Sequence, residues 1–221
     1  MSKSLSAFCP VPGLSGIYTA EKGNLRCTAV RLVGGGLCLY SPVQGLGDEA
    51  RESLVALGPV THLLAPNHYH HKGLAEYAAA FPKAIPCAPE AALSRLETQT
   101  GVVFTPLADA GIDLPAGSAW VTPEGLKTGE VWLDQVLPDG RLWIVTDAFC
   151  GPKTHKTGFA DAPELLGTFP IYGIADSAIY RDWLASALQS GAPTFIIPCH
   201  GAMIGGNDLA SKTLELVAGL T

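Results

Sequence analysis

The sequence is poor in charged residues, which make up 15% of its 221 positions and leave a formal net charge of −6. It has no cluster of Lys and Arg of the kind that binding to a phosphate backbone requires. It also has no apolar run near the ~20 residues of a membrane span, and Pro10 and Pro12 break any signal-peptide core near the start. We therefore expect a cytoplasmic protein with neither a nucleic-acid nor a membrane partner.

Paired cysteine spacings are also missing. None of the six cysteines forms a C-x-x-C motif, which excludes a thioredoxin motif and a zinc ribbon. Most have apolar neighbours, so we expect small buried hydrophobic side chains in a reducing compartment. Cys150 and Cys199 lie close in sequence to Asp147 and His200, which are considered below as metal ligands, but we expect both cysteines to pack rather than to bind metal. The glycine run at 34–36 lacks the G-x-G-x-x-G arrangement of a dinucleotide site.

Apolar residues and turn formers are abundant instead. Hydrophobic residues make up 48% of the chain, which contains 25 Gly and 17 Pro, so a sizeable core and many turns are expected. We find no internal repeat or low-complexity linker. The length fits one domain, residues 1–221.

The pattern of apolar runs predicts strands that alternate with helices. Short runs separated by turn sequences predict antiparallel hairpins, first over 16–42 and again around the turn at 137–140. Later strands are expected at 60–65, 84–88, 119–121, 130–136, 141–146 and 194–198. Helices are expected at 48–57, 73–81, 90–98, 174–189 and 209–218. This alternation indicates an α/β class protein, with sheet covered by helices.

Three of the six histidines crowd into one short loop. His68, His70 and His71 follow the strand expected at 60–65 and precede a helix. Imidazole is a common ligand of zinc and iron, and a loop between two rigid elements can direct several rings at one point. A solvated polar turn is the alternative interpretation, but the crowding favours metal binding. His62, inside the strand, is expected to be structural.

Two apolar strands of the second half each end in a potential ligand. Asp147 follows the strand expected at 141–146, and His200 follows the strand expected at 194–198. A carboxylate at the end of a buried strand is costly unless it is paired or bound to a metal. The segment 151–172 is expected to be a long loop, in which His155 either contacts substrate or is solvated.

These features together resemble the metallo-β-lactamase superfamily. Its members have a His-x-His-x-Asp-His loop that opens a helix, then a lone His, an Asp after a hairpin strand, and a late His in a Pro-x-His-Gly-like turn. The resemblance extends over most of the chain and is strongest to a group with a degenerate histidine loop. It implies an αββα sandwich of two mixed β-sheets with helices on the outer faces. The implied metal ligands come from five residues: His68, His70, His71, Asp147 and His200.

The chain departs from the pattern of this superfamily at two ligand positions. Pro66 occupies the place of the first loop His, and Leu126 occupies the place of the lone His. His70 stands where the family has Asp. The resemblance therefore implies one zinc or iron ion rather than two, with His68 as a further ligand, a hydrogen-bond donor to a ligand, or a proton carrier.

The function that the resemblance implies is metal-dependent hydrolysis. Metal-bound hydroxide would attack a small ester, thioester or lactone. One alternative is a catalytically degenerate member that binds a ligand or partner, and another is a metal-dependent oxidoreductase. The apolar composition is also compatible with a homodimer.

Overall fold

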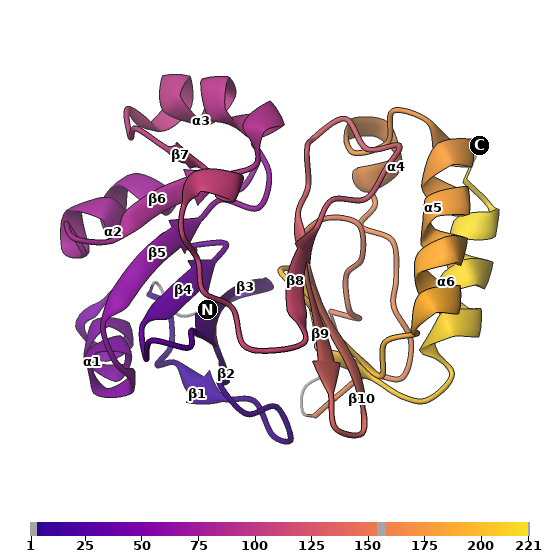
Figure 1. Ribbon diagram of the computed structural model, residues 1–221, viewed down its shortest axis with the longest axis horizontal. Coiled ribbons are helices and arrows are strands. Elements are labelled where there is room, and N and C mark those ends of the chain that lie inside the picture. The colour runs from indigo at the N-terminus through magenta and orange to yellow at the C-terminus, as the bar shows by residue number, and fades with distance from the viewer. Residues whose placement is uncertain (1–3, 154–157, 221) are drawn as a thin grey trace. The chain divides into compact units, whose positions relative to one another are not determined.

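The computed structural model describes residues 4–153 and 158–220. The chain divides into two compact units, Met1–Ala116 and Gly117–Thr221. Each unit has its own mixed β-sheet (Figure 1). Each also has its own cluster of buried apolar side chains. The assignment of 1–221 to one domain stays a prediction.

The first unit contains a seven-stranded sheet in which the strands are neighbours in chain order. The strands are β1 (Cys9–Pro10), β2 (Ile17–Lys22), β3 (Leu25–Arg31), β4 (Leu37–Tyr40), β5 (Val60–Leu64), β6 (Ile85–Ala88) and β7 (Thr105–Pro106). Strands β1 to β4 pair antiparallel, as the predicted hairpins require, whereas β4 to β7 pair parallel.

Parallel neighbours need crossover connections, which helices provide here. The connections are α1 (Asp48–Leu57), α2 (Leu74–Ala80), and the 3-10 helix η1 (Glu90–Ala92) continued by α3 (Leu93–Thr100); η2 (Leu107–Asp109) follows β7. Alternate residues of β3 and β4, including Ala29 and Leu39, share a buried cluster with Leu54 of α1 and Tyr77 of α2. The predicted alternation of strand and helix is therefore confirmed in this unit.

The second unit contains a five-stranded sheet of order β12-β11-β10-β9-β8. Its strands are β8 (Ser118–Val121), β9 (Trp132–Leu137), β10 (Gly140–Val145), β11 (Phe195–Pro198) and β12 (Ile204–Gly205). The β9–β10 hairpin turns where the sequence predicts it, and β10 pairs parallel with β11. This one parallel pair brings the ends of β10 and β11 to the same edge of the sheet.

Helices of the second unit cover its apolar core. They are α4 (Phe169–Tyr172), α5 (Ser177–Ser190) and α6 (Leu209–Ala218), of which α5 and α6 run side by side (Figure 1). Helix α5 begins after Asp176, whose carboxylate accepts the backbone N–H groups of Ala178 and Ile179. Tyr180 and Leu184 of α5 pack in the same cluster as the β-sheet residues Trp132 and Trp143.

The differences from the predicted elements are short or lie at boundaries. The two-residue strands β1, β7 and β12 are too short for a periodic pattern to reveal, and α4 closes the segment predicted as loop. Strand β9 begins at Trp132 rather than at residue 130, and the side chain of Glu130, which precedes the strand, accepts hydrogen bonds.

Two expectations from composition can be compared with the structure. Five of the cysteines are buried, as predicted, and Cys9 is exposed. Across residues 4–153 and 158–220, no helix has both the length and the hydropathy needed to cross a bilayer.

Candidate metal centre

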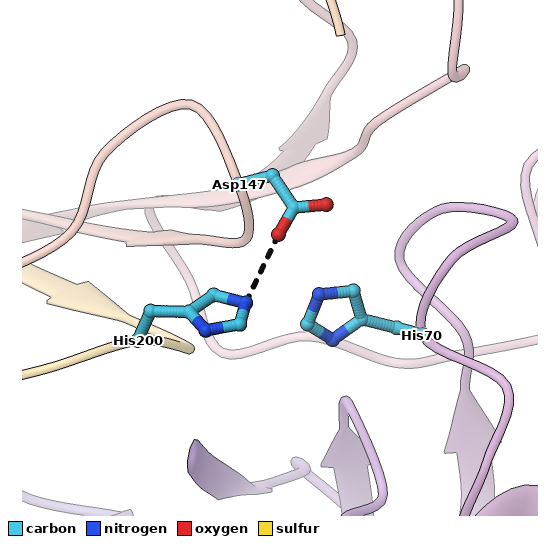
Figure 2. Close-up of side chains that lie close together, drawn as sticks. All are labelled: His70, Asp147 and His200. Carbon is cyan, nitrogen blue, oxygen red and sulfur yellow. Dashed lines mark hydrogen bonds and ion pairs between the residues drawn. The ribbon is translucent and has the colours of Figure 1, made fainter. Parts of the chain in front are cut away.

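Asp147 and His200 come together at one edge of the second sheet. Val145 and Pro198 are partners in the parallel β10–β11 pair, so the residues that follow them leave the sheet as neighbours. The Nε2 atom of His200 lies 3.0 Å from Oδ1 of Asp147 (Figure 2). The side chains of His200 and Asp147 are 22% and 13% exposed, so both are largely screened from water. The carboxylate of Asp147 therefore has a hydrogen-bonding partner in His200.

A second carboxylate, that of Glu130, lies fully buried beneath Asp147. Oε1 of Glu130 accepts hydrogen bonds from Nε1 of Trp132 at 2.7 Å and from the backbone N–H groups of Thr146 and Ala148 at 3.1 and 3.3 Å. Oε2 accepts the N–H of Asp147 at 3.2 Å. Burial, and then the Asp147 carboxylate, raise the pKa of Glu130, and the hydrogen bonds from Trp132, Thr146 and Asp147 lower it, so that the pKa is about 7. The sequence interpretation missed this residue: Asp147 was identified because it follows an apolar strand, whereas Glu130 stands at the start of one.

The histidine loop of the first unit is shaped by Asn67. This residue is buried, and its side-chain oxygen accepts the backbone N–H groups of Tyr69 and His70 at 2.8 and 3.2 Å. Such a side-chain turn reverses the chain directly after β5. The loop therefore connects the end of a strand to α2, as predicted.

His70 is oriented by a serine at the end of β4. Its Nδ1 atom lies 2.6 Å from Oγ of Ser41, which leaves Nε2 as the ring nitrogen directed away from this bond. Ser41 is buried and has a φ of 57°, in the left-handed region that side chains other than glycine rarely adopt. The sequence contains no signal for this strained position, because the dihedral angle depends on how β4 meets the loop.

Variants of Ser41 separate the hydrogen bond from the strain. Ser41→Ala removes the bond to His70, and we expect the free energy of unfolding to fall by about 1 kcal/mol. Ser41→Gly removes the same bond but accepts the positive φ, so it should be more stable than Ser41→Ala by about 1 kcal/mol. Urea denaturation followed by circular dichroism measures both values. Equal stability of Ser41→Ala and Ser41→Gly would contradict the claim that the positive φ at residue 41 is strained.

The other loop histidines have different surroundings. His68 packs edge to face on Tyr69, with ring centroids 4.2 Å apart. The guanidinium of Arg95 lies over the Tyr69 ring, 5.0 Å from its centroid. Nδ1 of His71 lies 3.3 Å from the carbonyl oxygen of His68. Both histidines are half-buried, so each keeps a side accessible to water.

Several other predictions concern residues near these positions. His62 is structural, as predicted: it is buried, and its Nε2 lies 3.0 Å from the carbonyl oxygen of Ala110. Cys150 and Cys199 are buried. Leu126 packs against the apolar cluster of the second unit. His155 lies outside the described residues.

Comparisons with known proteins identify the fold. No family model matches the chain, and no curated protein matches it. Solved structures do match, over nearly the whole of both chains. A metallo-β-lactamase from Hirschia baltica is 11% identical, with 97% of this chain and 98% of that chain covered and a TM-score of 0.61. Another, from Erythrobacter litoralis, is 16% identical, with 96% of each chain covered and a TM-score of 0.64.

A third similar structure is a metallo-β-lactamase from Pseudomonas aeruginosa in a mono-zinc form. It is 15% identical, with 97% of this chain and 95% of that chain covered and a TM-score of 0.61. Identities this low carry information about the fold alone. The expected fold of two mixed β-sheets with helices is confirmed.

Proposed function

The chain has the metallo-β-lactamase fold, and on that premise we propose that it is a metal-dependent hydrolase with a single ion. The observation that carries the proposal is the approach of Asp147 and His200. Two donor atoms that share a hydrogen bond at 3.0 Å can instead share an ion, with a small adjustment of each side chain. One carboxylate and one imidazole match the ligand types that zinc prefers.

We propose His70 as the third ligand beside Asp147 and His200, as the resemblance of the sequence implies. Ligating histidines usually hydrogen-bond through their other ring nitrogen, which sets the ring orientation. His70 has such a bond, from Nδ1 to Ser41. The proposal requires His70 and the Asp147–His200 pair to bind the same ion, and the variants described below test that requirement.

His68 and His71 would have supporting roles in this centre. We propose His71 as a further ligand, and His68 as a ligand or a proton carrier beside the reacting water. A bound ion would act as a Lewis acid that lowers the pKa of a water molecule to about 7. As a proton carrier, His68 would accept or return the proton, and the proposed substrate is a small ester, thioester or lactone.

The replacement of two family ligands supports one ion rather than two. Pro66 has no donor atom in its side chain, and Leu126 packs with the apolar core of the second unit. The Pseudomonas aeruginosa relative, in its mono-zinc form, is an instance of this fold with a single zinc. Zinc is the metal that we propose, and iron is the alternative.

The same replacements favour a second candidate function. A chain that has lost two ligands can retain the fold as a ligand-binding or partner-binding protein without catalysis. The position of Leu126, partly buried against an apolar cluster, favours this candidate, because its side chain offers no donor atom to the second ion that two-metal hydrolysis uses. A metal-dependent oxidoreductase is a third candidate that no observation favours over the first.

For the rest of the protein's setting we propose a cytoplasmic location and a small-molecule substrate. Because the sequence has no cluster of Lys and Arg, we propose no nucleic-acid partner. A homodimer remains compatible with the apolar composition.

Metal content tests the proposal directly. Chain purified without a His-tag should contain about one zinc or iron per chain by mass spectrometry, because the proposed centre supplies three or more ligands. We expect Asp147→Ala, His200→Ala and His70→Ala each to lower that content at least about tenfold. His62→Gln, a histidine variant outside the proposed centre, should retain it.

A panel of small esters, thioesters and lactones then separates hydrolysis from binding alone. Hydrolysis that is lost with the metal and restored by zinc supports the enzyme. Binding without turnover supports the second candidate. Metal far below one per chain, even after reconstitution with zinc, would overturn the proposal.

A further inference from the structure

Glu130 is the one fully buried carboxylate that the proposed chemistry leaves without a role among the described residues. A buried carboxylate is costly, and Glu130 compensates with hydrogen bonds from N–H groups. Three of these donors are the consecutive backbone N–H groups of Thr146, Asp147 and Ala148. Glu130 therefore binds the backbone on both sides of Asp147, a candidate metal ligand.

The geometry explains how Glu130 can set the direction of the Asp147 side chain. Strand β10 ends at Val145, so the three following N–H groups have left the regular pairing of the sheet. One carboxylate that accepts all three fixes the orientation of consecutive peptide planes, and hence the Cα–Cβ direction of Asp147. Asp147 then reaches His200 at 3.0 Å.

We infer that Glu130 is the positioning residue of Asp147: its carboxylate holds the backbone of residues 146–148 so that the Asp147 carboxylate meets His200. The inference rests on the proposed function only in treating Asp147 as a metal ligand. If Asp147 is a ligand, replacing Glu130 should also weaken metal binding, because replacing residues that orient metal ligands typically lowers metal affinity 10- to 100-fold.

Glu130→Gln tests the inference with a minimal change of shape. A glutamine whose carbonyl oxygen replaces Oε1 keeps three acceptor contacts. Its NH₂ group then faces the Asp147 N–H, so that the bond made by Oε2 is lost. Glu215→Gln, an exposed position on α6, removes the same charge as a matched control. Glu130→Asp keeps the charge but shortens the side chain by one methylene, and it replaces Glu130→Gln if the glutamine variant does not fold.

Two measurements on the metal-free protein do not depend on the proposed function. Amide hydrogen exchange of residues 146–148 should become at least about tenfold faster in the Glu130 variant, while the exchange of β11 amides stays unchanged. The ¹⁵N signals of the His200 ring should shift, because the bond from its Nε2 to Asp147 is displaced. A third measurement, zinc titration, should give an affinity about 10- to 100-fold weaker.

The outcomes separate the two claims. Unchanged His200 signals with faster exchange throughout the second unit would assign Glu130 a general role in stability and overturn the inference. A second outcome is that the Glu130 variant shows shifted His200 signals and faster exchange confined to residues 146–148, while the unmodified chain binds no zinc. That outcome would support the inference and overturn the proposed function. Wild-type behaviour of the Glu130 variant in all three measurements would also overturn the inference.

Discussion

Replacing Gly201 by alanine should lower the free energy of unfolding by about 2–5 kcal/mol and weaken metal binding as well. Gly201 has a φ of +76°, and a Cβ atom there would lie 2.0 Å from the carbonyl oxygen of Gly151. The left-handed conformation costs an L-residue about 1–2 kcal/mol, and overpacking typically adds about 1–3 kcal/mol. Backbone cannot yield as a flexible side chain would.

The contact matters because it joins the two segments that carry the candidate ligands. Gly151 lies in the segment after Asp147, and its N–H donates to the carbonyl oxygen of His200 at 2.9 Å. Forcing Gly201 away from Gly151 would therefore separate the Asp147 and His200 side chains. Zinc titration of Gly201→Ala should show an affinity at least about tenfold lower than that of the unmodified chain.

Gly167→Ala is the matched control in the same unit. Nothing lies within 4 Å of a Cβ atom at Gly167, and its φ is outside the left-handed region. We expect its stability to stay within about 0.5 kcal/mol of the unmodified chain by urea denaturation. Equal stability of the two alanine variants would refute a tight contact between the two segments.

Replacing Trp132 by alanine should cost about 3–5 kcal/mol of unfolding free energy, the range for removing a large buried aromatic side chain. Trp132 is fully buried at the start of β9. Its ring centroid lies 5.3 Å from that of Trp143, 5.7 Å from that of Phe149 and 5.4 Å from that of Trp183. The truncation also removes the Nε1–H donor to Glu130. The cavity and the lost hydrogen bond therefore act on the same region.

Two further variants distinguish these contributions. Trp132→Phe fills most of the cavity but still lacks the N–H donor, so we expect a loss between those of the alanine variant and the unmodified chain. Val136→Ala, on the same strand at a side chain that is 56% exposed, should change stability by less than about 0.5 kcal/mol. Urea denaturation followed by far-ultraviolet circular dichroism avoids the signal change from a missing tryptophan. A Trp132→Ala midpoint equal to that of Val136→Ala would count against this packing.

The chemical groups of the candidate centre were identifiable from sequence because they occupy characteristic positions. Asp147 and His200 directly follow apolar strands, and the crowded histidines follow the strand that became β5. The end of a strand can be recognised from a short stretch of sequence, because the strand ends where its apolar run ends. The expectation that Asp147 needs a partner or a metal followed from the free-energy cost of placing a carboxylate at the end of a buried strand.

The partners of those groups came from long-range packing. His200 is 53 residues from Asp147, and only the parallel register of β10 and β11, with Val145 opposite Pro198, brings them to 3.0 Å. The serine that orients His70 lies 29 residues before it. No local pattern encodes which strands become neighbours.

The sequence by itself determined the class of this fold and the residue types of its candidate centre, because hydrophobic periodicity and donor chemistry are properties of short segments. Tertiary structure alone decided that Glu130 faces inward to three backbone N–H groups and that Ser41 adopts a positive φ. Both features arise where a strand end meets a segment that is distant in sequence. Their energies depend on burial and on hydrogen-bond geometry, and these exist only once the chain has folded.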